Sequence, residues 1–223
     1  MLKGLKLHTH NITAVVTVAD DGGSSGILRS DLGMLAPGDV RNCVSALAEV
    51  DPVMGELLNF RFKDGSLKGH SLGNLFLAAL NETSSSFDEA VKKFSHLTGV
   101  VGTVYPVTNE SVTLSALLED GRLIEGESHI GVHHDGPKNG IVKLMVNPEK
   151  PKAVDGVIKA LEKADIIVLG PGSLYTSIIP NLLVDGVVDA IKKSNAVKIY
   201  VCNIMSQAGE TENYTVSDHL AAI

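Results

Sequence analysis

NITAVVTVADDGGSSG, residues 11–26, is the stretch that decides the fold of this chain. Its first part, from Ile12 to Val18, is a short apolar run that is rich in β-branched residues and free of Gly and Pro. Such a run has the length and composition of a β-strand. Because it is apolar on both faces, it predicts a strand covered on both sides, as in the parallel sheet of an α/β protein.

Two carboxylates and a glycine-serine run follow this strand directly. Glycines allow a ligand to approach the backbone closely, and successive N–H groups with serine hydroxyls can bind an anion. Adjacent carboxylates suit a ribose hydroxyl or a divalent cation that bridges phosphates. The pattern is neither GxGxxG nor a Walker A loop, and a tight turn without a ligand is the alternative. The candidate ligand-binding residues are Asp20, Asp21, Gly22, Gly23, Ser24 and Ser25, and the candidate Mg²⁺ ligands among them are Asp20 and Asp21.

Length and composition describe an ordinary globular chain. It has 223 residues, 44% hydrophobic and 20% charged, which is enough to build a substantial core. The net charge of −7 argues against sequence-independent nucleic-acid binding, which needs a basic surface. The two cysteines form no CxxC pair, no apolar run has transmembrane length, and the N-terminus does not read as a signal peptide. These features predict a cytoplasmic protein without membrane insertion.

The remaining sequence predicts one α/β domain over residues 1–223, with a β-hairpin and a strand inserted over residues 111–146. Apolar periodicity predicts helices over 40–50, 53–62, 72–80 and 87–96, with Asp39 as the N-cap of the first. Alternation after Val112 and a turn at Asp120-Gly121 predict the hairpin. Buried strands expected over 165–169 and 197–202 alternate with helices, which implies right-handed crossovers and a mostly parallel sheet.

A second glycine-containing loop follows the strand expected over 165–169. Its residues Gly170, Gly172 and Ser173 precede a helical segment, so their N–H groups could face a phosphate with help from the helix dipole. Gly172 is expected to need a positive φ. Asn203 ends the next strand and is expected at the same edge of the sheet. A loop without a ligand is an equally good interpretation of this segment.

Three other polar groups are candidates for a role in catalysis or binding. His70 and Asn74 stand one turn apart at the start of an apolar helix, where His70 could contact a phosphate or act as a base, or could simply cap the helix. Arg41 is expected to pair with a nearby acid. His133-His134-Asp135 lacks the spacing of metal ligands and is expected to be a solvated loop. No pattern suggests a covalent nucleophile.

Several long phrases in this sequence resemble the gluconeogenesis factor family of the YvcK type, whose enzymatic relative is 2-phospho-L-lactate transferase of the CofD type. They are ITAVVTVADDGGSSG, PGDVRN, GHSLGNLFLAAL, VYPVT, VLGPGSLYTSIIPNLLV and CNIMSQAGET followed by SDH. The resemblance implies a Rossmann-like fold in a bacterial protein. It also implies binding of a uridine-diphosphate sugar such as UDP-N-acetylglucosamine, and a link to cell-wall metabolism and cell shape during gluconeogenic growth.

The same resemblance leaves two functions open. One is a nucleotide-sugar sensor that binds without turnover, with no certain cofactor; the other is a Mg²⁺-dependent phosphotransferase of the 2-phospho-L-lactate transferase type. The scarcity of aromatic residues for stacking a flat acceptor favours the sensor. The family's first strand and its GGGTGLS-like loop are expected upstream of Met1, and the final helix is expected to continue past Ile223. An unpaired strand edge left by such a truncation would favour a homo-oligomer.

Overall fold

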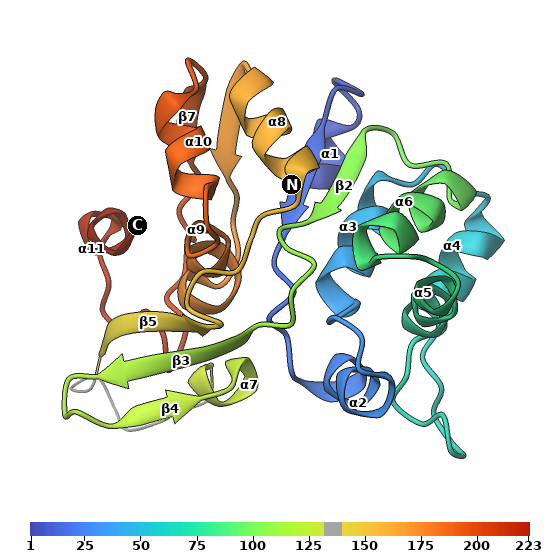
Figure 1. Ribbon diagram of the computed structural model, residues 1–223, viewed down its shortest axis with the longest axis horizontal. Coiled ribbons are helices and arrows are strands. Elements are labelled where there is room, and N and C mark those ends of the chain that lie inside the picture. The colour runs from blue at the N-terminus through green and yellow to red at the C-terminus, as the bar shows by residue number, and fades with distance from the viewer. Residues whose placement is uncertain (132–139) are drawn as a thin grey trace. The chain divides into compact units, whose positions relative to one another are not determined.

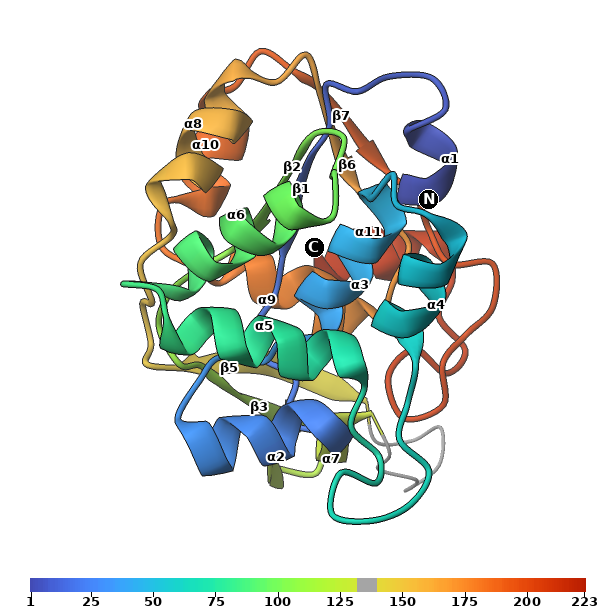
Figure 2. The same cartoon turned by 90° about the vertical axis from the view of Figure 1, so that its right-hand side faces the viewer.

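The computed structural model describes residues 1–131 and 140–223, which form two compact units, Met1–Ser111 and Val112–Ile223. Figures 1 and 2 show the secondary structure of both units from two directions. His133-His134-Asp135, expected to form a solvated loop, lies outside the described residues. The units are described one at a time below.

The first unit consists of a pair of parallel strands with helices packed against it. Strands β1 (Thr13–Val16) and β2 (Thr103–Pro106) pair in parallel, with Thr13 opposite Thr103 and Val16 opposite Pro106. Helices α3 and α6 pack against β2, and α5 packs against α6. Besides α1 (Leu2–Leu5), the helices are α2 (Gly23–Leu32), α3 (Gly38–Leu47), α4 (Pro52–Asn59), α5 (Leu72–Glu82) and α6 (Phe87–Leu97).

The helices of this unit follow the apolar periodicity of the sequence. Phe94 on α6, Leu77 on α5 and Leu47 on α3 are fully buried, and the ring of Phe76 meets that of Phe94 edge-on. Ser86 caps α6 by accepting a hydrogen bond from the backbone N–H of Glu89. On β1, the buried residues Ala14 and Val16 alternate with the exposed Thr13 and the half-buried Val15, so one face is covered more fully than the other and the strand is not fully buried on both faces as predicted.

The second unit contains an antiparallel sheet and a second parallel pair. Strand β3 (Thr113–Leu118) pairs antiparallel with β4 (Leu123–Glu125) and with β5 (Ile141–Asn147). Strands β6 (Ile166–Leu169) and β7 (Val197–Tyr200) pair in parallel, with Ile166 opposite Val197. The helical segments are α7 (Glu127–Ile130), α8 (Asp155–Lys163), η1 (Leu174–Ile178), α9 (Ile179–Leu182), α10 (Val187–Lys193) and α11 (Val216–Ala222).

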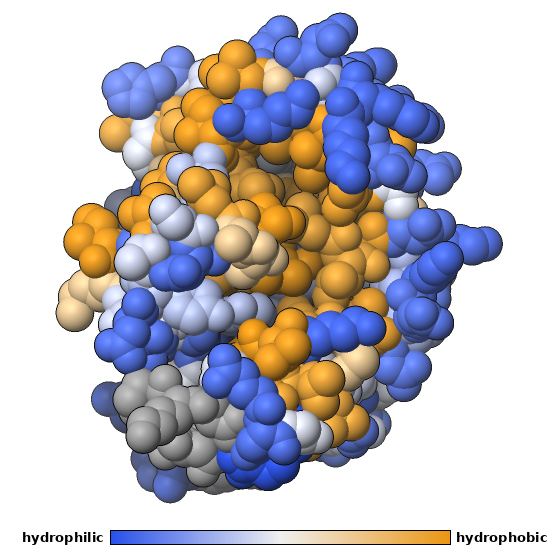
Figure 3. Space-filling model, turned by 90° about the vertical axis from the view of Figure 1, so that its left-hand side faces the viewer, coloured by the Kyte–Doolittle hydropathy of each residue, from blue (hydrophilic) through white to orange (hydrophobic). Residues whose placement is uncertain are grey.

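Strand β6 is not buried on both faces, contrary to the expectation from its apolar sequence. Ile167 is buried, whereas Ile166 is 58% exposed and its partner Val197 on β7 is 61% exposed. In a parallel pair, partnered residues face the same side of the sheet, so the face of the β6–β7 pair that carries Ile166 and Val197 is open. Figure 3 shows a broad apolar area on the face of the molecule that it presents. Across the described residues, no helix is both long enough and apolar enough to cross a membrane.

Candidate functional site: an uncapped helix start beside paired carboxylates

The glycine-serine run after β1 is the start of helix α2 and not an extended loop. Gly22 is the N-cap, and the helix proper begins at Gly23, whose φ of +46° favours glycine. A side chain at Gly26 would place its Cβ 2.0 Å from the carbonyl oxygen of Asp21. The turn from the strand into the helix is therefore so tight that only glycine fits at that position.

The first N–H groups of α2 have no acceptor within the described part of the chain. No side chain caps this helix, and no hydrogen bond is donated by the backbone of Gly23, Ser24 or Ser25, although both serines are buried. Helices α5, α6 and α11 differ, since each is capped by a serine or threonine hydroxyl. Unsatisfied N–H groups at a helix start, with the positive end of the helix dipole, commonly bind anions, so the start of α2 is the candidate anion site.

The structure brings together Ser24, His70 and Asn74, which are far apart in the sequence. The Ser24 hydroxyl lies 3.0 Å from Nδ1 of His70, and Asn74 donates to it from Nδ2 over 3.1 Å. Arg41 donates in turn from Nε to Oδ1 of Asn74 over 3.3 Å. All four side chains are at most 7% exposed. They form a continuous buried polar network behind the start of α2.

Arg41 does not pair with an acid, as the sequence suggested it would. Its second hydrogen bond, from Nη1, goes to Oδ1 of Asn59 over 2.9 Å, so both of its acceptors are neutral amides. No salt bridge of Arg41 occurs among residues 1–131 and 140–223. Burial and, second, the nearby charge of Arg61 lower the pKa of Arg41. The buried cation is therefore uncompensated by a carboxylate in direct contact.

Two carboxylates come close to each other on the other side of this helix start. Burial, followed by the charge of Asp20, raises the pKa of Asp39. Gly38 makes the approach possible, because a Cβ there would lie 2.6 Å from Oγ of Ser25 and 3.0 Å from Oδ2 of Asp20. Asp39 was expected as an N-cap but lies inside the first turn of α3, whose N-cap is Pro37. A divalent cation would relieve the repulsion between these carboxylates.

Asp20 and Asp21 have different surroundings. Asp20 accepts a hydrogen bond from the N–H of Gly22 over 2.9 Å, which fixes the turn. Asp21 instead lines a shallow surface pocket of about 320 Å³, together with Gly26, Arg29, Ser30, Gly33, Met34 and Ser111. No group of three or more His, Cys, Asp or Glu side chains in the described ranges could hold a metal ion. A cation here would have to share its ligands with a bound phosphate, as Mg²⁺ commonly does.

The second predicted loop, in the second unit, is held by its own neighbours. Parallel pairing of β6 and β7 brings Asn203 beside Gly172, whose N–H donates to Oδ1 of Asn203 over 3.3 Å. Asn203 Nδ2 donates back to the carbonyl of Gly172 over 2.7 Å. Gln207 donates to the Ser173 hydroxyl over 2.7 Å. Gly170, the first residue of this loop, directly follows β6.

A buried carboxylate accepts hydrogen bonds at the start of η1, the helical segment that follows this loop. Glu210 is 5% exposed and accepts hydrogen bonds from the N–H of Tyr175 over 3.0 Å and the hydroxyl of Thr176 over 3.2 Å. Gly172 does not have the positive φ expected of it, and a Cβ there would lie in ordinary contact, 3.5 Å from Ser177. The N–H groups of Gly172 and Tyr175 are thus bonded to Asn203 and Glu210, whereas those of Gly23, Ser24 and Ser25 have no acceptor in the described residues.

The buried charge of Glu210 predicts a pH-dependent stability. Burial is the main cause that raises the pKa of this carboxyl above its usual 4.5, so the folded state binds the proton more tightly than the unfolded state. The stability that Glu210 contributes is therefore lost as pH rises from about 4.5 through the folded pKa. Glu210→Gln keeps an acceptor for Tyr175 without the charge, so its melting temperature should fall less than that of the wild type over this range. Parallel melting curves for the two proteins would contradict this expectation.

Three residues of these sites were not predicted as site residues: Asp39, expected only as a helix cap, and Gln207 and Glu210. Each lies in one of the phrases that carry the family resemblance, PGDVRN and CNIMSQAGET, but none belongs to a motif with a known spacing. Their contacts join residues 19 to 35 positions apart, which no local pattern encodes.

The fold and the first site together define an α/β protein with a candidate anion site at a helix start beside two carboxylates. Comparison with known proteins makes this class specific: the chain belongs to the family described as 2-phospho-L-lactate transferase CofD, whose model matches residues 1–223. Proteins named gluconeogenesis factor from Halalkalibacterium halodurans and Bacillus subtilis are 49% and 46% identical to it over 226 residues. These comparisons confirm the resemblance seen in the sequence.

The relatives are longer than this chain. It spans 49% of a Clostridium acetobutylicum relative that is 53% identical over 223 residues, and 68% of the B. subtilis protein. A crystal structure of a Bacillus halodurans protein superposes with a TM-score of 0.95 at 48% identity, over 99% of this chain and 70% of that one. This match confirms the α/β fold with parallel strands flanked by helices.

Proposed function

We propose that this chain binds a nucleotide sugar of the UDP-N-acetylglucosamine type, with the diphosphate at the start of α2. The observation that carries the proposal is the set of open N–H groups of Gly23, Ser24 and Ser25 at a buried, uncapped helix start. Membership in a family described by a phosphorylated substrate supports a phosphate as the anion. In this proposal the protein is a cytoplasmic regulator linked to cell-wall metabolism and cell shape during gluconeogenic growth.

The residues predicted around the start of α2 have the following parts in this proposal. The N–H groups of Gly23 to Ser25 bind the phosphates, and the Ser24 hydroxyl adds a donor. Asp20 and Asp21 contact the ribose or a cation, since both follow β1 at its carboxyl end. The loop from Gly170 to Ser173 belongs to the second unit and has no part in this proposal, since the N–H of Gly172 is already bonded to Asn203.

The test is a calorimetric binding panel of UDP-N-acetylglucosamine, UDP-glucose, GDP and NADP, each with and without Mg²⁺. We expect a UDP-sugar to bind most tightly and Ser24→Ala to weaken its binding by about ten- to hundredfold, since a hydrogen bond to a charged group contributes ~1.5–3 kcal/mol. Ser66→Ala is the control, because Ser66 is exposed and does not line the pocket that contains Asp21. Equal affinity of the two variants, or no binding of any nucleotide, would refute the proposal.

The closeness of Asp39 and Asp20 favours a second candidate, a Mg²⁺-dependent phosphotransferase like the family's namesake. The two carboxylates fit a divalent cation, whose chemistry would be to neutralise charge on a transferring phosphoryl group. Asp20 and Asp39 would hold the cation, and the N–H groups of α2 would orient the phosphate. Such a reaction needs no nucleophile from the protein.

Asp39→Asn separates stability from cation binding at this position. The raised pKa of Asp39 shows that its charge is unfavourable in the folded state, so the neutral amide should increase the melting temperature when no cation is present. The same variant should lose any stabilisation that the wild type gains from Mg²⁺ with GDP or a UDP-sugar. Asp31→Asn, on the exposed end of α2, is the control and should retain it. A Mg²⁺ response that survives in Asp39→Asn would exclude this cation site.

A further inference from the structure

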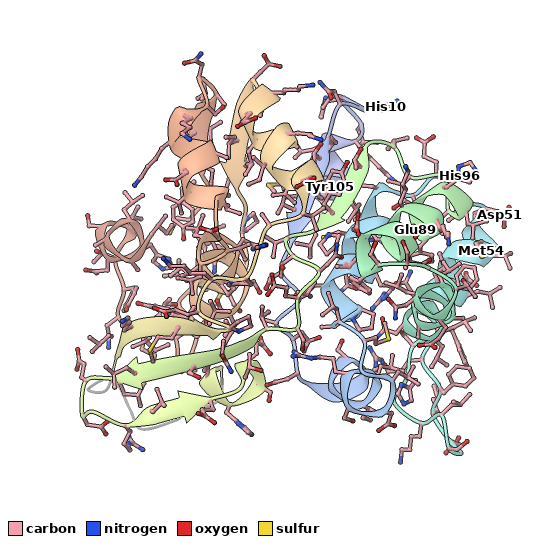
Figure 4. All side chains as sticks on the ribbon, in the orientation of Figure 1. His10, Asp51, Met54, Glu89, His96 and Tyr105 are labelled. Atoms are coloured by element: carbon pink, nitrogen blue, oxygen red, sulfur yellow. The ribbon has the colours of Figure 1, made fainter. Side chains whose placement is uncertain are left out.

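The outer side of helix α4 is apolar and exposed. The helix packs on α5, and Leu58 is its buried residue. The other large apolar side chains of the helix and of its C-cap are 44% to 64% exposed; these residues, here called the α4 face, are Val53, Met54, Leu57 and Phe60. Figure 4 shows Met54 at the outer edge of the first unit. A helix that is apolar on both its inner and its outer side is normally buried, so the α4 face indicates an interaction surface.

The α4 face is one continuous strip. Val53, Leu57 and Phe60 follow each other at intervals of four and three residues, which places their side chains on the same side of a helix. The ring of Phe60 meets that of Phe62 edge-on, with 5.1 Å between the ring centroids, so a neighbouring side chain holds the end of the strip. Glu56, the charged residue within α4, borders the strip. An apolar strip along a helix is the kind of surface by which one helix packs on another.

The charges at the two ends of the α4 face have opposite signs. Two exposed acids precede the helix and two exposed bases follow it: Glu49, Asp51, Arg61 and Lys63. Further along the same segment, Asp64 and Lys68 carry opposite charges and leave this pattern unchanged. If a second copy of α4 lay antiparallel on the first, the acidic end of each helix would lie beside the basic end of the other. Because the whole chain carries a net charge of −7, two copies repel each other unless their contact surfaces are complementary.

We propose that two copies of this chain associate through the α4 face, with their α4 helices antiparallel about a two-fold axis near Leu57. Each copy uses the same surface, so the contact closes at a dimer and leaves no open face for a third copy. Leu57 then meets the partner's Leu57, and Asp51 lies beside the partner's Lys63. An interface made of one short helix from each copy is small, so the dimer is weak and depends on protein concentration. This proposal does not rest on nucleotide binding.

Analytical ultracentrifugation of the full chain tests the proposal. Between about 1 µM and 1 mM protein, the range of weak to moderate affinities, the average mass should rise from that of one chain towards that of two. Leu57→Asp places two like charges together at the axis and should weaken the association by about a hundredfold or more. Leu32→Asp is the matched control, since Leu32 on α2 is 47% exposed, against 44% for Leu57, and does not belong to the α4 face. This control should associate as the wild type does.

An exchange of charges tests the antiparallel arrangement. Lys63→Glu brings two acids together at each end of the interface, and Asp51→Lys brings two bases together, so each variant alone should associate about tenfold more weakly than the wild type. A mixture of the two variants has an acid beside a base at both ends and should recover most of the lost affinity. Asp51 also caps α4 by accepting a hydrogen bond from the N–H of Val53 over 2.9 Å. Loss of this cap persists in the mixture, so it cannot explain a recovery.

Three results would overturn this inference. They are a wild type that remains a single chain at about 1 mM, a Leu57→Asp protein that associates like the wild type, and a mixture no stronger than its two components. The first result would mean that a different partner covers the α4 face. Because Leu57 is exposed, Leu57→Asp should melt close to the wild type; if it unfolds instead, the charge exchange decides. A dimer without affinity for any nucleotide would support this inference and refute the proposed nucleotide-sugar function.

Discussion

Replacing Gly26 with alanine is expected to abolish anion binding and to destabilise the first unit by about 3 kcal/mol, or roughly 6–12 °C in melting temperature. The reason is steric, since the new Cβ would lie 2.0 Å from the backbone oxygen of Asp21. Neither atom is at the end of a flexible side chain, so the turn between β1 and α2 must open. The N–H groups of Gly23 to Ser25 would then lose their common orientation.

Gly55→Ala is the matched control for this substitution. Gly55 lies inside helix α4, and a Cβ there would meet only a methyl group of Val50 at 3.8 Å. Alanine is the better helix former, so this variant should be as stable as the wild type or more stable by up to ~1 kcal/mol. Thermal denaturation measures the stability, and a titration with sulfate followed by NMR measures the anion affinity. A Gly26→Ala protein with normal affinity and a normal melting temperature would show that the tight turn is not required.

Replacing Gly73 with alanine should produce the second large effect, a loss of about 2–3 kcal/mol together with weaker anion binding. A Cβ at Gly73 would lie 2.6 Å from the carbonyl oxygen of Leu58 and 2.9 Å from Cδ of Arg41. Helix α5 would have to move away from the end of α4, and Arg41 would be pushed from its place beside Asn74. The variant should therefore disturb the buried network without altering any of its polar side chains.

Gly172→Ala, in the second unit, is the control for Gly73→Ala. Its new Cβ would make an ordinary contact of 3.5 Å, and its φ is not positive, so little loss of stability is expected. Melting temperatures and sulfate affinities of the two variants should differ clearly. If Gly73→Ala keeps the affinity of the wild type while losing stability, the network behind α2 would be structural only.

Much of the fold could be predicted from local pattern. The helices from Gly38 to Leu97 follow apolar periodicity, and the capping serines stand where their types indicate. Strand β2 was not predicted, because TVYP is short and ends in a proline, so it carries no clear alternation. Strands β6 and β7 were predicted, but their exposure was not. The apolar character of Ile166 and Val197 indicates a strand, yet it does not tell whether both faces of that strand are covered.

The sequence by itself determined the elements of the candidate site, because backbone conformation near a glycine or a cap depends on a few neighbouring residues. The run from Asp20 to Ser25, with His70 and Asn74, could be named without coordinates. Only the tertiary structure decided which groups are already satisfied. Glu210 accepts a hydrogen bond from the N–H of Tyr175, Arg41 donates to a neutral amide, and Asp39 approaches Asp20. Each of these contacts joins residues that are distant in the sequence, so no local pattern predicts it. Whether a buried group has a hydrogen-bond partner or a compensating charge depends on the residues packed around it, and only the folded structure determines which residues those are.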